Sequence, residues 1–235
     1  MASYEDLEWD ARQEEYESRL YDEIIAQYQQ SDQFAIDVDN EIDGRINEIV
    51  HGHIDGRLQE FYLANPDIAK SSMSLLVQSQ ELYAQGFYSS SQVFGGAAIE
   101  VTFKRVLFFP IVHGFVPIDS IAQMVVQVFT KSIHEIGRFQ GLLIHAISLF
   151  SSIDVLTFKP GSSTNSLWEE ATQVRKQRNA ILHEAISVSR EEAAQSILVA
   201  ETLLDTVFPA LLKTIDLHRH SDGSIYAGYG CKGGC

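Results

Sequence analysis

The chain has 235 residues, of which 45% are hydrophobic and five are prolines. This length supports one good-sized domain with a buried core plus an appendage, and this composition excludes the disordered class. A net charge of -15, from 17 basic and 32 acidic residues, excludes a general nucleic-acid coat, because binding many phosphates requires basic residues.

Residues 1–65 are expected to form an acidic helical hairpin. Apolar residues recur at helical spacing in its second half, and the pattern stops at Asn65-Pro66. The favoured interpretation is a solvated hairpin packed on the main domain, and the alternative is an arm that masks a basic groove or docks a partner. The stripe consists of Ile42, Ile46, Ile49, Ile54, Leu58 and Phe61.

The chain opens with acidic residues, so no signal peptide is expected. Its longest apolar run, 106–118, is too short to span a bilayer. We therefore expect a cytoplasmic protein with no membrane segment. The only two cysteines lie near the C-terminus, so the fold is not expected to depend on disulfides.

Residues 66–216 are predicted to form an all-α bundle. A helix over about 68–85 should end at Gly86, and a second over 88–109 should end at Pro110. Two further helices, about 119–136 and 138–153, form an extra pair. His134 and His145 lie in that pair without a partner at ligand spacing, so no metal is inferred there.

The motif helix is predicted to begin after the breaker run 159–164. Ser166 and Glu169 have the spacing of a capping box, and Leu167, Ala171, Val174 and Ile181 form an apolar stripe. Arg178 falls within that stripe, where a guanidinium needs a partner. Arg175, Asn179 and His183 share a second face at i, i+4 and i+8.

The final helix begins at the capping box Ser189-Arg-Glu-Glu192, and a kink is expected at Pro209. Residues 217–235 are glycine-rich and are expected to be a flexible tail. His218, His220, Cys231 and Cys235 are chemically able to bind zinc, but their spacing is not that of a familiar finger.

The pattern Arg178-Asn179-x-x-x-His183 resembles the signature of the HEPN superfamily, and the stretch from Gly86 to Lys104 resembles its first helical hairpin. This resemblance implies a HEPN-like helical bundle and a metal-independent endoribonuclease without a cofactor, of the kind common in bacterial defence and toxin-antitoxin systems. It also implies a homodimer, in which two motifs meet in one composite cleft. An acidic residue that steadies the motif arginine is implied at Glu100.

The residue types suit that chemistry. The pKa of an ordinary imidazole lies near neutral pH, so His183 is suited to move a proton, and the planar guanidinium of Arg178 is suited to hold a phosphate. Asn179 is placed to orient the imidazole or to bind the phosphate. Arg175, Lys176 and Lys104 are the expected contacts to the RNA backbone. No binding to DNA is expected.

Two alternatives remain open. Glu100 either pairs with Arg178 in the interior or pairs with Lys104 on the surface, four residues along the same helix. The whole domain is either a nuclease or a non-catalytic HEPN-like module that binds nucleotides or a partner protein, such as an antitoxin or a subunit of a defence complex.

Overall fold

The computed structural model describes residues 19, 52–116, 118–131 and 136–228, without the side chains of 126–140, 142 and 143. The chain divides into two units, Met1–Gly52 and His53–Cys235, and the fold is that of the second. The described residues are mostly helical, which confirms the predicted all-α class. The acidic hairpin lies largely outside the described residues.

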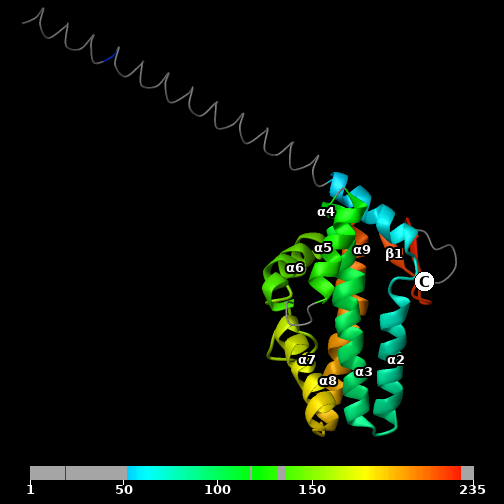
Figure 1. Ribbon diagram of the computed structural model, residues 1–235, viewed down its shortest axis with the longest axis vertical. Helices are drawn as coiled ribbons and strands as arrows, with labels where there is room; N and C mark the ends of the chain where they lie inside the picture. Colours follow the sequence, from blue (N-terminus) through cyan, green and yellow to red (C-terminus); the bar gives the residue numbers. More distant parts are fainter. Residues whose placement is uncertain (1–18, 20–51, 117, 132–135, 229–235) are drawn as a thin grey trace, which may run out of the picture. The chain divides into compact units, whose positions relative to one another are not determined.

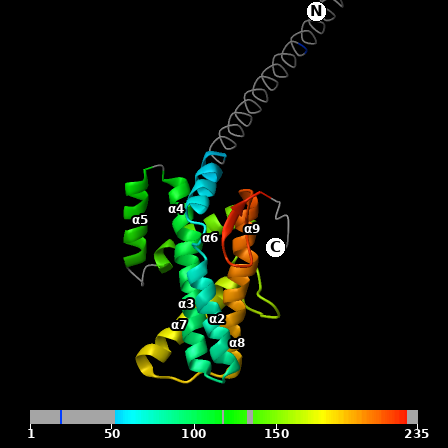
Figure 2. The ribbon, with the colours of Figure 1, turned by 90° about the vertical axis from the view of Figure 1, so that its right-hand side faces the viewer.

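The domain contains a group of three helices that run side by side. α2, α3 and α8 lie alongside one another in both side views, α7 packs on α3 and α8, and α5 packs on α4 (Figures 1 and 2). After a first helix over 52–64, the elements are α2 (Lys70–Ala84), α3 (Tyr88–Val101), η1 (Thr102–Phe108), α4 (Phe109–Phe115), α5 (Asp119–Lys131), α6 (Ile136–Ser151), α7 (Leu167–Glu184), α8 (Arg190–Thr202), η3 (Leu203–Val207), α9 (Phe208–Thr214), β1 (Leu217–Arg219) and β2 (Ile225–Ala227).

The C-terminal helix supplies much of the core. Leu203, Leu204, Val207, Phe208 and Leu211 are fully buried. Within the described residues, the continuous helix Arg190–Thr214 is the one segment long and apolar enough to cross a membrane, and 56% of its most apolar window is buried inside the domain. Burial of this kind is the pattern of a core helix.

The helix that begins at Tyr88 passes through Pro110, so the prediction that Pro110 ends it is wrong. α3 leads directly into the π-helix η1, and α4 follows with the proline in its first turn. Proline cannot donate an N–H to the preceding turn, and here the wider π-helical turn η1 comes directly before it. Pro209 follows the π-helix η3 in the same way, at the start of α9.

The predicted boundary at residue 65 differs from the division at Gly52. The helix over 52–64 does end at the predicted place, but Leu58 and Tyr62 are fully buried in the core of the second unit. The last turns of the expected arm therefore belong to the folded domain, because their apolar stripe is covered by the bundle.

The expected flexible tail contains a short antiparallel hairpin. β1 pairs with β2 in the register Leu217 to Ala227, and Leu217 and Ile225 are buried. Gly223 in the turn has φ +86°, which favours glycine. The hairpin was not predictable from the sequence, because each strand has only three residues and one of them is buried. A strand this short shows no alternation of apolar and polar residues.

Candidate functional site

The motif helix α7 is fixed at both ends. The Ser166 N–H donates to the Glu169 carboxylate at 2.8 Å, and the Glu169 N–H donates to the Ser166 hydroxyl at 3.3 Å, so the predicted capping box is confirmed. The helix ends after Glu184, where Ala185 adopts φ +54°. His183 therefore lies in the last turn of the helix.

Glu100 joins α3 to α7 by pairing with Arg178. The Arg178 Nη1 lies 2.7 Å from Glu100 Oε2, and Lys104 Nζ contacts the other carboxylate oxygen, Oε1. Both pairings proposed from the sequence therefore occur together. The side chains of Arg178, Glu100 and Lys104 remain 24%, 16% and 18% exposed, so the cluster is near the surface and is not sealed inside the domain.

The charges of this cluster hold Glu100 ionised. Burial alone would raise the pKa of Glu100, but the hydrogen bond from Lys104 and the nearby charges of Lys104, Arg178 and Arg175 outweigh it and lower the pKa below its ordinary value. Glu100 is thus a stable anion that positions two cations.

A glycine allows Arg178 to reach Glu100. A Cβ built on Gly96 would lie 3.1 Å from the Arg178 Cδ and 3.5 Å from a methyl group of Val174. The small residue lets α7 approach α3 closely. The Arg178 Nε is buried and has no hydrogen-bond partner among the described residues, so the pairing does not use the whole guanidinium.

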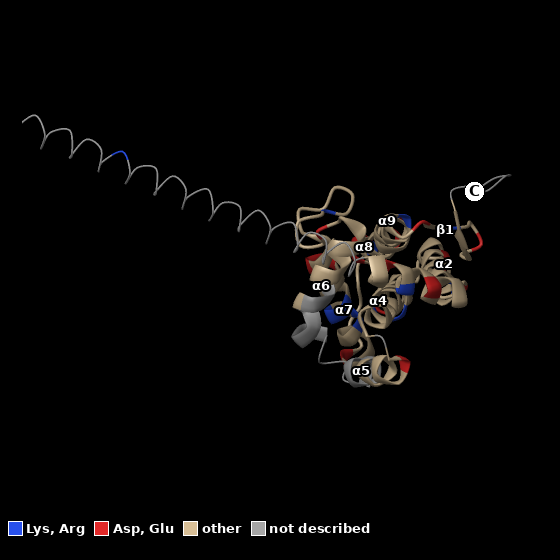
Figure 3. Ribbon diagram, turned by 90° about the horizontal axis from the view of Figure 1, so that it is seen from above, with Lys and Arg blue, Asp and Glu red and all other residues tan. Residues whose placement is uncertain are grey.

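Asn179, His183 and Lys176 lie on the exposed part of α7, while Arg175 is half-buried. Among the described residues no hydrogen bond involves the side chains of Asn179 or His183, so the expected contact between them is not formed. Figure 3 shows the basic residues of α7 in blue. Arg175 and Glu100 also line a small hollow of about 40 Å³, with Trp168, which is room for about one water.

A chain of amides beside Arg178 was not foreseen from the sequence. The Gln92 amide donates to Gln177 at 2.8 Å, and the Gln177 amide donates to Glu192 at 2.8 Å, which links α3, α7 and α8. Gln92 is fully buried, and its Oε1 has no partner among the described residues. The available signal was a glutamine within the otherwise small and apolar stretch of α3.

The suggested zinc ligands are only partly described. The rings of His218 and His220 lie 5.5 Å apart on the hairpin, while Cys231 and Cys235 lie outside the described residues. Within the part of the chain that the structure covers, no three His, Cys, Asp or Glu side chains are grouped to hold a metal ion.

No protein-family model matches the chain, and neither the curated proteins nor the solved structures yield a match. The structure defines the class as a mainly α-helical domain with a cationic cluster between α3 and α7.

Proposed function

We propose that the chain is a metal-independent endoribonuclease of the HEPN type. The observation that carries the proposal is the arrangement on α7, where exposed Asn179 and His183 lie one turn apart and Arg178 is held at their side by Glu100. Two neighbouring faces of α7 thus offer a guanidinium for a phosphate and an imidazole for a proton.

The reaction assigned to these groups is transesterification. The ribose 2′-oxygen forms a bond to phosphorus and loses its proton to one imidazole, the bond to the 5′-oxygen breaks, and an acid protonates that oxygen. The products are a 2′,3′-cyclic phosphate and a 5′-hydroxyl. Arg178 stabilises the charge on the phosphorane, and Glu100 is a positioning residue for Arg178.

A single α7 supplies one imidazole, whereas the reaction uses a base and an acid. We therefore assign the active form to a homodimer in which His183 of both copies faces a shared cleft. Leu182 and Ile186, 54% and 41% exposed, support this assignment because they place apolar surface beside His183. The role in bacterial defence or a toxin-antitoxin pair belongs to the same proposal.

The test is cleavage of single-stranded RNA by the purified full chain in EDTA. We expect products with cyclic phosphate ends, and loss of at least about a hundredfold in rate for His183→Ala, the size of a general acid-base contribution. The matched control is His145→Ala, because His145 is another exposed helical histidine. Equal cleavage by wild type and His183→Ala, or no cleavage by either, contradicts the proposal.

A second candidate function is a non-catalytic module that binds a partner protein. It is favoured by the neutralisation of Arg178 through Glu100 and by the net charge of -15, which opposes RNA binding. This function predicts that the chain forms a stable complex with the product of a neighbouring gene, and that His183→Ala leaves the complex intact. Under the nuclease proposal, the same variant is inactive on RNA.

A further inference from the structure

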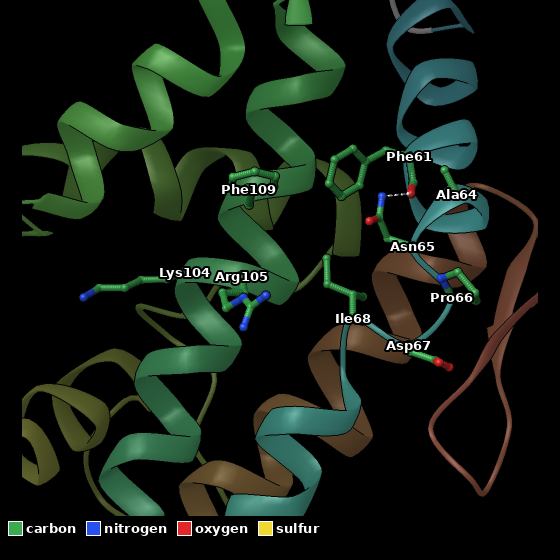
Figure 4. Close-up of a pocket in the computed structure, with 9 residues that line it drawn as sticks. All are labelled: Phe61, Ala64, Asn65, Pro66, Asp67, Ile68, Lys104, Arg105 and Phe109. Atoms are coloured by element: carbon green, nitrogen blue, oxygen red, sulfur yellow. Dashed lines mark hydrogen bonds between the residues drawn. The ribbon is translucent and has the colours of Figure 1, made fainter. Parts of the chain in front are cut away.

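A second hollow, larger than the one beside Trp168, lies away from the exposed face of α7. Its volume is about 720 Å³, within the range of sites for small organic molecules. Its walls come from three segments: the end of the first helix with the turn after it, the π-helix η1, and the start of α4 (Figure 4). The lining residues are Phe61, Ala64, Asn65, Pro66, Asp67, Ile68, Lys104, Arg105 and Phe109.

Arg105 brings an uncompensated charge to this hollow. Lys104 extends away from the other lining residues toward its partner Glu100, and Asp67 pairs with Lys70 at 2.8 Å (Figure 4). Among the described residues no carboxylate pairs with Arg105, although acidic residues outnumber basic ones almost two to one in the chain. A guanidinium left unpaired in so acidic a protein is available to an anion from outside.

The remaining walls are apolar and fixed by packing. The rings of Phe61 and Phe109 lie 5.6 Å apart, and both also pack on the buried ring of His113, at 4.8 and 5.0 Å. The Asn65 amide is held at the edge of the hollow by its bond to the Phe61 carbonyl oxygen at 2.9 Å. The shape is thus formed before any ligand arrives.

The backbone at the site is a further independent observation. Arg105 lies in η1, and π-helical turns inside α-helices occur frequently at functional sites, where the wider turn redirects side chains. Here the turn places two successive cations in different environments, since Lys104 faces Glu100 and Arg105 faces the hollow (Figure 4).

The geometry points to a binding site for a small organic anion, a carboxylate or phosphate monoester on a flat apolar body. The anionic group pairs with Arg105, the body packs against Phe109, Phe61 and Ile68, and the Asn65 amide offers a hydrogen bond at the rim. None of the groups assigned to the ligand lies on α7, and Lys104, which lines the hollow, is turned toward Glu100, so the proposal does not depend on the nuclease activity.

The experiment is calorimetric titration of the full chain with phenyl phosphate, benzoate and inorganic phosphate. We expect phenyl phosphate or benzoate to bind one molecule per chain, and inorganic phosphate to bind at least about tenfold more weakly because it has no apolar body. The stronger of the two aromatic probes then identifies the anionic group.

Two variants assign the binding to this hollow. Arg105→Gln should weaken it about ten- to hundredfold, the value of a charged hydrogen bond, and Ala64→Trp should block it by filling the space from an exposed lining position. Arg190→Gln is the matched control, because Arg190 is an exposed arginine that contacts Tyr83 on α2. Absence of binding by both aromatic probes, equal binding of inorganic phosphate, or unchanged binding in Arg105→Gln and Ala64→Trp overturns the proposal.

Discussion

The hydroxyl of Tyr62 donates a hydrogen bond to the carbonyl oxygen of Val106 at 2.6 Å, and both residues are fully buried. In an α-helix this carbonyl would accept from residue 110, which is a proline and has no N–H. In the π-turn η1 the ladder is shifted by one residue, and the first helix of the domain adds, through one phenol, a donor to this carbonyl next to Pro110.

The Tyr62→Phe variant tests this contact. It keeps the ring packing but leaves a buried carbonyl short of a donor, so the free energy of unfolding should fall by about 1–3 kcal/mol. The measurement is urea unfolding followed by circular dichroism. Tyr226→Phe is the control, because Tyr226 is exposed, and it should change stability by less than about 0.5 kcal/mol. Equal effects of the two changes would show that the Tyr62 hydroxyl is not needed.

Close helix packing at Gly95 gives a second prediction. A Cβ at this position would lie 2.5 Å from the Ser196 Oγ and 3.1 Å from its Cβ, so Gly95→Ala must either turn the Ser196 hydroxyl out of its bond to the Ala193 carbonyl or move α3 and α8 apart. We expect a loss of about 1–3 kcal/mol in unfolding free energy, partly recovered when Ser196→Ala is added.

Gly141→Ala is the matched control for Gly95→Ala. Gly141 is an exposed helical glycine, and among the described residues no atom beyond its own helix turn lies within 4 Å of the position of its Cβ. Its replacement should increase stability by up to about 1 kcal/mol through helix propensity alone. Stabilisation by both substitutions would contradict tight packing at Gly95.

Local signals in the sequence predicted much of this fold. α7 and α8 each begin at a predicted capping box. α2 ends just before Gly86, which has φ +82°, close to the predicted end of that helix. The apolar stripe also indicated that Arg178 needs a counter-charge, but Glu100 as its partner was implied only by the family resemblance, and the sequence also allowed a pairing of Glu100 with Lys104. The helix ends depend on residues close together in the sequence, and the need of Arg178 for a counter-charge follows from its place in an apolar stripe.

Features that depend on distant partners were not predictable. The helix continues through Pro110 after a π-turn that has no simple sequence pattern, and the Val106 carbonyl in that turn accepts from Tyr62, 44 residues away. The hairpin has contacts far earlier in the chain, since the Ile225 N–H donates to the Pro66 carbonyl oxygen at 3.0 Å and the Ser224 hydroxyl donates to Asp67 at 3.2 Å. The hollow beside Arg105 is formed by three separate segments, so no single motif marks it.

The pKa of Glu100 gives a prediction about acid stability. Because the folded state lowers this pKa from its ordinary value of 4.5, the cluster stabilises the fold above that pH and loses its contribution as the pH falls through the lowered pKa. Glu100→Gln should cost about 1–3 kcal/mol at pH 7, and the difference from wild type should shrink toward pH 3. Urea unfolding at both pH values measures it.

The other carboxylates titrate equally in wild type and in Glu100→Gln. The difference in unfolding free energy between the two proteins therefore reports on Glu100 alone. Glu201→Gln is the matched control, since the Glu201 carboxylate accepts from Gln80 on an exposed surface, and its effect should stay within about 0.5 kcal/mol at either pH. A difference between wild type and Glu100→Gln that is the same at pH 7 and pH 3 would show that the carboxylate charge contributes nothing.

The shared cleft of the proposed nuclease gives a prediction for mixed subunits. If each active cleft needs His183 from two copies, equal amounts of wild type and His183→Ala, after exchange of subunits, leave both imidazoles in only about a quarter of the dimers. Activity per wild-type chain should therefore fall to about half. Addition of His145→Ala in place of His183→Ala should cause no fall, because its dimers keep both motif histidines. If the rate per wild-type chain is independent of added His183→Ala and of dilution, each subunit acts alone, and the second proton-transfer group must be sought within one copy.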